Sequence, residues 1–226
     1  MNIKINIDSK VKKQFPDLKL ATVMVRSVNV EETSSHKLQV IMETVNKLRN
    51  RFTMDSIKDN SIIRAYRDFY WRLKVDPTKQ RPASEALLRR IVKGLGLPSV
   101  NNVVDACNLA SVETLIPIGL YDYDKVEGEL TLRFAHNGEV FKPIGGKYEV
   151  LTSNQIVLSD SVKILHVYPF RDSIDTMITK NTRNVLIVSC GAPKIPKELI
   201  IEAAVKTSKY IQIFAGGFIG EVAIIE

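Results

Sequence analysis

The spacing of apolar residues changes from a helical period to a strand period near residue 114, and this change constrains the fold more than any other feature. Between residues 35 and 111, apolar side chains recur at intervals of three and four, which predicts amphipathic helices. From Thr114 onward, short apolar runs separated by glycines and Asp-rich turns predict strands. Helices followed by a run of strands is an α+β order rather than the regular alternation of a doubly wound sheet. We therefore predict one domain, residues 1–226, in which N-terminal helices pack on a mixed, mostly antiparallel sheet.

The same pattern gives bounds for each element. The expected helices are Ser35–Phe52, Ser61–Leu73, Ser84–Lys93, a helix capped by Ser99 that runs to Ser111, and Lys197–Ser208. The expected strands are Asn2–Ile7, Leu18–Val28, Thr114–Tyr121, Glu129–Phe134, Val140–Pro143, Ile156–Leu158, Val162–Val167, Asn184–Ser189, Tyr210–Ala215 and Glu221–Ile225.

The charge balance is basic, with 32 Lys and Arg against 25 Asp and Glu and a formal net charge of +7. An excess of positive charge attracts polyanions such as RNA, and it is informative if the charges gather on one face. Apolar runs such as Ile211–Ile219 are far shorter than the roughly 18–20 residues that a membrane span needs. The first residues lack the continuous apolar core of a signal peptide. We therefore expect a cytoplasmic protein that does not enter a membrane.

Cysteine and histidine spacing gives no sign of a metal site. Cys107 and Cys190 lie far apart and match no metal or redox motif, so we expect two buried, reduced thiols, with a disulfide as the alternative. His36, His136 and His166 show no ligand spacing and are interpreted as ordinary surface or core residues. No phosphate-binding loop, dinucleotide fingerprint or nucleophile elbow occurs. The sequence predicts neither a metal nor a cofactor.

Small polar residues recur on one side of the helix expected after Ser99. They are Asn101, Asp105 and Asn108, opposite the apolar residues Val100, Val103, Val104 and Cys107. Short amides and a carboxylate make hydrogen bonds of fixed reach. The spacing alone leaves two interpretations open: bonds that hold neighbouring loops, or the wall of a ligand pocket.

The segment that begins with this helix, NNVVDACNLASVETLIPIGLYDYDKVEGELTLRFA (Asn101–Ala135), resembles the tRNA-editing domain of the phenylalanyl-tRNA synthetase beta subunit, the B-three/B-four module. The resemblance rests on Asn101, Val103, Val104, Asp105, Asn108, Pro117, Asp122, Asp124, Gly128, Arg133, Ala135, Gly138 and Glu139. Two further segments, PTKQRPASEALLRR (Pro77–Arg90) and RDSIDTMITKNTR (Arg171–Arg183), resemble free-standing relatives of that domain. Together the similar segments cover about Phe15 to Gly217.

This resemblance implies hydrolysis of the ester between a wrongly chosen amino acid and its tRNA. In the synthetase, the domain removes tyrosine from the phenylalanine tRNA, because a synthetic pocket poorly rejects an isostere that only adds a hydroxyl. The implied partner is an aminoacylated tRNA, held through phosphate contacts. Two alternatives remain open: a module that binds tRNA without hydrolysing it, and a small-molecule pocket for an amino acid or related metabolite.

The resemblance also implies roles for single residues. Asn108 is predicted to orient the substrate or the attacking water, and its alternative is a helix-to-loop hydrogen bond. Arg171 and Asp172 are predicted to form a catalytic pair in which Arg171 meets a phosphate or a substrate carbonyl, and the alternative is an ordinary ion pair.

A second set is predicted to bind the substrate: Asp105, Gly119, Tyr121, Gly145, Gly146, Thr176 and Thr179. For Asp105 the favoured interpretation is that it braces the adjoining strand. The threonines recur with Thr182 every three residues, which suggests hydroxyls along one side of a turn, and the glycines allow a close backbone approach. Simple structural roles remain alternatives for all of them.

The chain departs from the synthetase pattern at two places. The pocket histidine of the synthetase, two residues after the strand proline, is Gly119 here. Gln155 lies where free-standing relatives often carry Glu. The amino acid that would be removed therefore does not follow from the resemblance.

Overall fold

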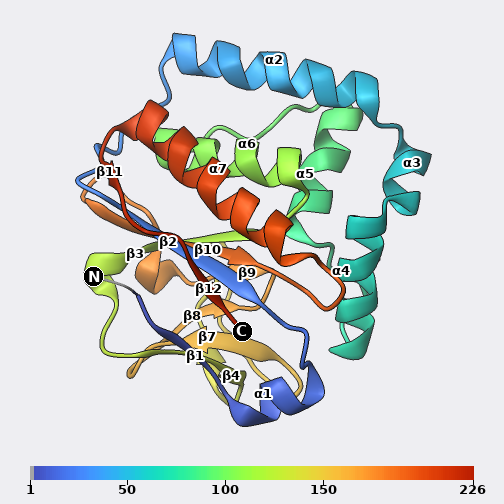
Figure 1. Ribbon diagram of the computed structural model, residues 1–226, viewed down its shortest axis with the longest axis vertical. Coiled ribbons are helices and arrows are strands. Elements are labelled where there is room, and N and C mark those ends of the chain that lie inside the picture. The colour runs from blue at the N-terminus through green and yellow to red at the C-terminus, as the bar shows by residue number, and fades with distance from the viewer. Residues whose placement is uncertain (1–2) are drawn as a thin grey trace.

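The computed structural model describes residues 3–226 and separates into a helical part and a strand-rich part (Figure 1). The helices are α1 (Ser9–Gln14), α2 (Ser35–Arg51), α3 (Met54–Asp59), α4 (Ser61–Arg72), α5 (Ala83–Val92), α6 (Asn102–Thr114) and α7 (Lys197–Ala215), with short 3-10 turns η1 (Tyr123–Lys125) and η2 (Ile174–Thr176). The strands are β1 (Ile5–Ile7), β2 (Leu20–Arg26), β3 (Ile118–Asp122), β4 (Leu130–Phe134), β5 (Val140–Phe141), β6 (Glu149–Val150), β7 (Ile156–Ser159), β8 (Ile164–Val167), β9 (Arg171–Asp172), β10 (Asn184–Cys190), β11 (Phe218–Ile219) and β12 (Ala223–Ile225).

The strands form two five-stranded sheets and a separate β5–β6 hairpin. One sheet has the order β1-β4-β7-β8-β9, and the other has the order β11-β2-β10-β3 with β12 also paired to β2. β1 runs parallel to β4, whereas the other pairings in these sheets are antiparallel. The predicted α+β fold with a mixed, mostly antiparallel sheet is confirmed, although the strands divide between two sheets.

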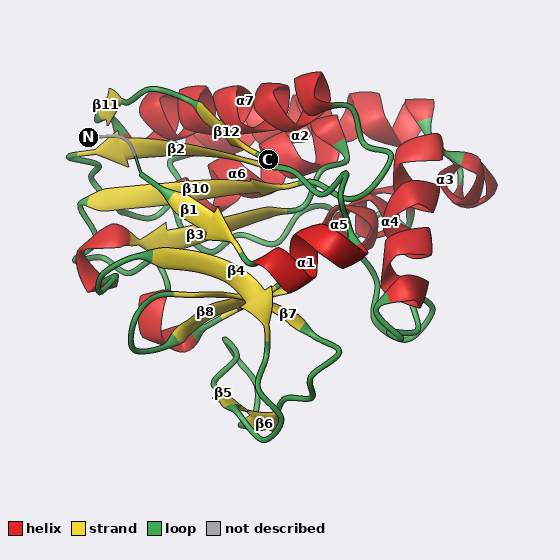
Figure 2. Cartoon of the chain, turned by 60° about the horizontal axis from the view of Figure 1, so that its bottom comes forward, coloured by secondary structure: helices red, strands yellow, loops and turns green. Residues whose placement is uncertain are grey.

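The layers are visible in Figure 2, where α2, α6 and α7 lie on one side of the β2-β10-β3 sheet and the β4-β7-β8 strands lie on the other. Helix α7 packs against both β2 and β10. A continuous cluster of buried apolar residues joins the helices to both sheets. Because β10 is covered on both faces, its residues Val185–Cys190 are all buried.

Two sequence-based boundaries were wrong for reasons that the local structure explains. Tyr210–Ala215 was expected to be a strand, but it is the end of α7, whose buried residues Ile211 and Phe214 continue the helical spacing onto β2 and β10. Ser99 was expected to cap α6, but the cap is Asn101, whose side chain accepts hydrogen bonds from the N–H groups of Val103 and Val104 at 3.1 and 2.9 Å.

The helix α6 also runs further than expected. It extends to Thr114 and ends at Leu115, which adopts a left-handed conformation with φ 61°. The strand predicted from Thr114 therefore begins only at Ile118. The predicted first strand is present as Ile5–Ile7, while Asn2 lies outside the described residues.

The first and last strands lie beside each other. β1 contacts β12. The Lys12 ammonium donates to the backbone carbonyl of Glu226 at 2.7 Å, and Lys19 forms an ion pair with the Glu226 side chain at 3.1 Å. Across residues 3–226, none of the helices has the length and apolar character needed to cross a bilayer.

Candidate functional site

The centre of the candidate site is a hydrogen-bonded pair, His166 and Asp172. The antiparallel β8–β9 pairing places these residues directly opposite each other. The His166 Nδ1 atom lies 2.8 Å from Asp172 Oδ1, and the side chains are 5% and 28% exposed. The carboxylate therefore fixes the orientation of a buried imidazole, and Asp172 is the member of the pair that reaches the surface.

Buried tyrosine and cysteine side chains surround this pair. The ring of Tyr121 on β3 lies edge-on to His166, with 6.1 Å between centroids. The Tyr121 hydroxyl is buried and has no hydrogen-bond partner among the described residues. Burial, and then the charge of Asp172, raises the pKa of Tyr121 well above its ordinary value. The hydroxyl is thus a neutral polar group enclosed beside a carboxylate.

The two cysteines are free and buried, as expected from the sequence. The Cys190 Sγ atom lies 3.8 Å from His166 Nε2. Burial, and then the charge of Asp172, raises the pKa of both Cys107 and Cys190. A thiol needs to be a thiolate to attack a substrate, so neither cysteine is an activated nucleophile despite the adjacent histidine.

Gly119 makes room for Tyr121. A Cβ atom at position 119 would collide with the Tyr121 hydroxyl and would lie 3.3 Å from Asp172 Oδ1. A side chain at position 119 and the hydroxyl of Tyr121 therefore exclude one another. The structure brings Gly119, Tyr121 and Asp172 together. The imidazole of His166, on β8, lies beside the same carboxylate. We call Gly119, Tyr121, His166, Asp172 and Cys190 the Asp172 cluster.

The loop that contains Gly145 and Gly146 is tied to β9. The N–H of Ile144 donates to the carbonyl of Asp172 at 3.0 Å, and the N–H of Ile174 donates to the carbonyl of Lys142 at 2.9 Å. Gly145 has φ +69°, a conformation that favours glycine in this turn. Both glycines are exposed, so the loop forms a rim next to Asp172.

Arg171 and Asp172 have different partners. Adjacent residues of a strand point to opposite faces, so Arg171 pairs with Glu149 on β6 while Asp172 pairs with His166. The ion pair fits the structural alternative for Arg171, and a catalytic role of the two residues stays a prediction.

Asn108 lies half-buried on α6, and its side chain makes no hydrogen bond to another described residue. Its neighbour Cys107 contacts the carbonyl of Ile118 at 4.0 Å, which fixes this part of α6 against β3. The amide is therefore free to meet a ligand, and its catalytic role stays a prediction.

Asp105 braces two loops rather than the adjoining strand. Its carboxylate accepts hydrogen bonds from the Thr33 hydroxyl at 2.6 Å, the Val100 N–H at 2.8 Å and the Ser99 hydroxyl at 3.1 Å. Both oxygens are occupied in a site that is 2% exposed, which favours the structural alternative over substrate binding.

The predicted threonines separate into two roles. Thr179 shapes a turn, since its N–H donates to the Thr182 hydroxyl at 2.9 Å, and that hydroxyl donates to Asp122 at 2.8 Å. Thr176 on η2 is buried, and its hydroxyl has no partner among the described residues. Thr176 thus retains hydrogen-bonding capacity that Thr179 does not.

Sequence reasoning missed His166, which was interpreted as an ordinary residue. The available signal was the turn Tyr168–Phe170 between two short strands, because a hairpin there pairs His166 with Asp172. No group of three or more His, Cys, Asp or Glu side chains within residues 3–226 is arranged to hold a metal ion.

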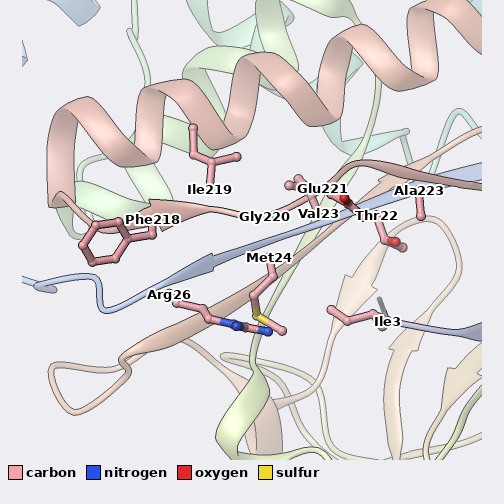
Figure 3. Close-up of a pocket in the computed structure, with 10 residues that line it drawn as sticks. All are labelled: Ile3, Thr22, Val23, Met24, Arg26, Phe218, Ile219, Gly220, Glu221 and Ala223. Carbon is pink, nitrogen blue, oxygen red and sulfur yellow. The ribbon is translucent and has the colours of Figure 1, made fainter. Parts of the chain in front are cut away.

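A separate hollow lies along β2 and β11, away from these residues (Figure 3). It has a volume of about 320 Å³, and Met24, Arg26 and Phe218 contribute to its lining. None of the predicted site residues lines it. Its lining includes Arg26 and Glu221 but no histidine, cysteine or tyrosine.

Comparisons with known proteins identify relatives of this chain. The chain is 26% identical over 174 residues to the phenylalanine–tRNA ligase beta subunit of Protochlamydia amoebophila, covering 75% of this chain and 21% of the relative. The beta subunit of Aquifex aeolicus is 32% identical over 94 residues, or 42% of this chain and 12% of the relative. The chain thus spans only about a fifth or less of these relatives.

A solved structure shows a related fold. An N-terminal fragment of the phenylalanyl-tRNA synthetase beta subunit from Pyrococcus horikoshii aligns with a TM-score of 0.53 at 16% identity, covering 97% of this chain and 50% of the fragment. The B3/4 domain family matches residues 65–206, which is more than half of the 226 residues. The resemblance found in the sequence is confirmed, and the chain belongs to the B3/4 domain family.

Proposed function

We propose that this chain hydrolyses the ester that joins an amino acid to a tRNA, acting in trans on a misacylated tRNA. The observation that carries the proposal is the Asp172–His166 pair, in which a partly exposed carboxylate is held by a buried imidazole at 2.8 Å. Membership of the B3/4 family and the resemblance to the editing domain supply the substrate class.

Asp172 is positioned to act as a general base. A water bound to its exposed side would attack the ester carbonyl carbon while passing a proton to the carboxylate. The C–O bond to the ribose then breaks, the ribose oxygen takes the proton, and the products are the free amino acid and the deacylated tRNA. The ester is already activated, so orientation of water and carbonyl supplies much of the required acceleration.

Asn108 and His166 have different parts in this scheme. The free amide of Asn108 would donate a hydrogen bond to the carbonyl oxygen of the substrate as negative charge develops there. His166 is buried and bonded to Asp172, so it is a positioning residue that holds the carboxylate in one orientation. The rim loop with Gly145 and Gly146 would border the bound ester.

The decisive experiment is deacylation of a panel of misacylated tRNAs by the purified protein. Turnover of one ester is expected, and Asn108→Ala and Asp172→Asn are each expected to lower it by about 100-fold or more. Asp175→Asn is the matched control, because it makes the same charge change three residues away, where the carboxylate pairs with Lys142 at 3.8 Å. Asp175→Asn is expected to keep full turnover.

His166→Gln separates positioning from folding. The variant is expected to lower kcat about 100-fold with KM unchanged, since a small misplacement of a reacting group costs this much. If turnover fell only in proportion to the fraction of folded protein, the result would contradict a positioning role for His166. Circular dichroism under the assay conditions gives the folded fraction.

A tRNA-binding module without hydrolysis is the second candidate, and the observation that favours it is Gly119 in place of the synthetase histidine. Salt-dependent tRNA binding with no turnover of any ester would establish this second candidate. If the protein neither binds tRNA nor hydrolyses any of the esters, the remaining candidate is a pocket for an amino acid or a related metabolite.

A further inference from the structure

Cationic side chains converge on one hollow at the surface of α5. The hollow has a volume of about 360 Å³ and is lined by Lys79, Arg81, Ala86, Arg89, Arg90, Lys93 and Leu95. We call these residues the α5 hollow. Five of the seven are Lys or Arg, and none of these described lining residues is acidic or aromatic.

The helical repeat explains why the charges share one face. Ala86, Arg89, Arg90 and Lys93 are spaced by three and four residues, so they form one stripe along α5. A further cation approaches the end of the stripe from α2, where Arg49 is held by a hydrogen bond from its Nε to the carbonyl of Ile91 at 3.3 Å. The exposed face of α5 is thus continuous with the basic end of α2.

Four of the five lining cations lack an ion-pair partner among the described residues. Arg89 is neutralised by Glu85, which also pairs with Arg67. The other four are exposed: Lys79, Arg81, Arg90 and Lys93. Like charges one helical turn apart repel each other, so Arg90 beside Lys93 destabilises the free helix. An anionic ligand would remove that repulsion on binding.

We propose that the α5 hollow binds the phosphate backbone of tRNA. Charge complementarity selects a polyanion, and the lack of an aromatic residue in the lining removes the usual platform for stacked bases. The contacts are therefore to phosphates and are independent of base sequence. The choice of tRNA as the polyanion rests on the proposed function.

The position of the hollow fits that choice. Helix α5 packs on α6, and the Ser84 hydroxyl donates to the carbonyl of Leu115 just after α6 at 2.9 Å. Helix α6 carries Asn108, so the docking surface and the predicted substrate amide belong to two helices in direct contact. The body of the tRNA would bind α5 while its acylated end reaches the candidate site.

The test is binding of unacylated tRNA, which does not depend on hydrolysis. Fluorescence anisotropy is measured between 50 and 200 mM KCl for the wild type and for Arg81→Gln/Arg90→Gln/Lys93→Gln. Loss of three phosphate contacts is expected to reduce the slope of log K against log salt by about 2 to 3, and to weaken binding on the order of 100-fold near 0.1 M salt. The matched control is Lys180→Gln/Lys197→Gln/Lys209→Gln, which removes three exposed lysines elsewhere and is expected to bind with at most a small loss.

The proposal would be overturned if the α5 variant kept the wild-type salt slope and the wild-type affinity for tRNA. It would also be overturned if the control variant lost as much affinity as the α5 variant. Patch-dependent binding of inorganic phosphate with no patch-dependent binding of tRNA would also overturn it, in favour of a small-anion site. Hydrolysis is followed separately on a short CCA oligonucleotide ester, for which the α5 variant is expected to match the wild type. Failure of the wild type on that ester would reject the proposed hydrolysis and leave the binding result intact.

Discussion

The Asp172 cluster holds its polar groups buried and close together, whereas the α5 hollow displays its charges on the surface. In the cluster, strand register sets His166 opposite Asp172, and Tyr121, His166 and Cys190 are closed to solvent. In the hollow, helical spacing collects several like charges on an open surface. A buried, partnered group fixes geometry, whereas exposed cations supply attraction over a distance. The comparison assigns the chemical step to the cluster and the capture of the RNA to the hollow.

The strongest test of this division is to measure both deacylation and tRNA affinity for a variant of each region. Asp172→Asn is expected to lower deacylation about 100- to 10,000-fold, the range for loss of a general base. Its affinity for unacylated tRNA should stay within about twofold of the wild type. The α5 triple variant should show the reverse pattern, with weaker binding of unacylated tRNA and wild-type hydrolysis of the short CCA oligonucleotide ester. If each variant reduced turnover and affinity in parallel, the two regions would not have separate tasks.

The next largest effect is expected at Glu85, the buried carboxylate that anchors the inner edge of the α5 hollow. Glu85→Ala leaves Arg67 and Arg89 without their shared partner, and we expect the free energy of unfolding to fall by about 3 kcal/mol. Urea denaturation at pH 7 measures this change. Glu43→Ala, at an exposed position of α2, is the control and should change stability by less than about 0.5 kcal/mol.

The stabilisation that Glu85 gives the wild type depends on pH. Burial alone would raise the pKa of Glu85, but the hydrogen bonds and charges of Arg67 and Arg89 outweigh burial and lower it below its ordinary value of 4.5. The stabilisation is therefore present above about pH 4.5 and is lost as the pH falls through the lowered pKa of the folded state. The difference between wild type and variant should shrink at acid pH. A constant difference down to pH 3 would contradict this account.

A smaller effect tests how tightly the Asp172 cluster is packed. Gly119→Ala is expected to destabilise the fold by about 1 to 3 kcal/mol, because the new Cβ meets the Tyr121 hydroxyl. Tyr121→Phe removes a buried hydroxyl without a partner and should cost less than about 1 kcal/mol. In the double variant, the loss should be smaller than the sum by about 1 kcal/mol, as measured by a thermal or urea denaturation cycle. Strict additivity would show that the obstacle is the ring carbon Cζ of Tyr121, which lies 2.8 Å from the added Cβ and is kept in the Phe variant, and not the hydroxyl.

The smallest effect concerns access to the cluster. Burial raises the pKa of Cys107 and Cys190, so both thiols should resist a thiol reagent in the folded protein even at pH 9. Both should react within minutes in guanidinium chloride. Mass spectrometry after iodoacetamide treatment distinguishes the two positions. Rapid native labelling of Cys190 would mean that the cluster opens to solvent.

The sequence predicted regular elements better than their ends. Helix α2 and strand β10 follow from long periodic patterns, and the structure places them within about two residues of the expected bounds. The end of α7 was misassigned because YIQIF alternates over a few residues, and so short a pattern suits either a strand or a buried helix. Packing of Ile211 and Phe214 with the core decides between them, and packing is not encoded in local spacing.

The candidate site was predictable to a similar degree. The polar residues of α6 were found from their spacing and the RDS segment from the resemblance, and the structure brings Asp172 to Gly119 and Tyr121. The hydrogen bond between His166 and Asp172 depends on the register of a two-residue strand, which no periodic pattern sets. The bracing role of Asp105 depends on Thr33, which is distant in sequence.

The contact between β1 and β12 couples the first and last strands of the fold. Lys12 donates to the Glu226 carbonyl, Lys19 pairs with the Glu226 side chain, and β1 contacts β12. The last strand therefore depends on contacts from the segment that holds β1 and α1, and a change that loosens that segment also removes support from β12. Local opening would then involve the two strands together rather than either one alone.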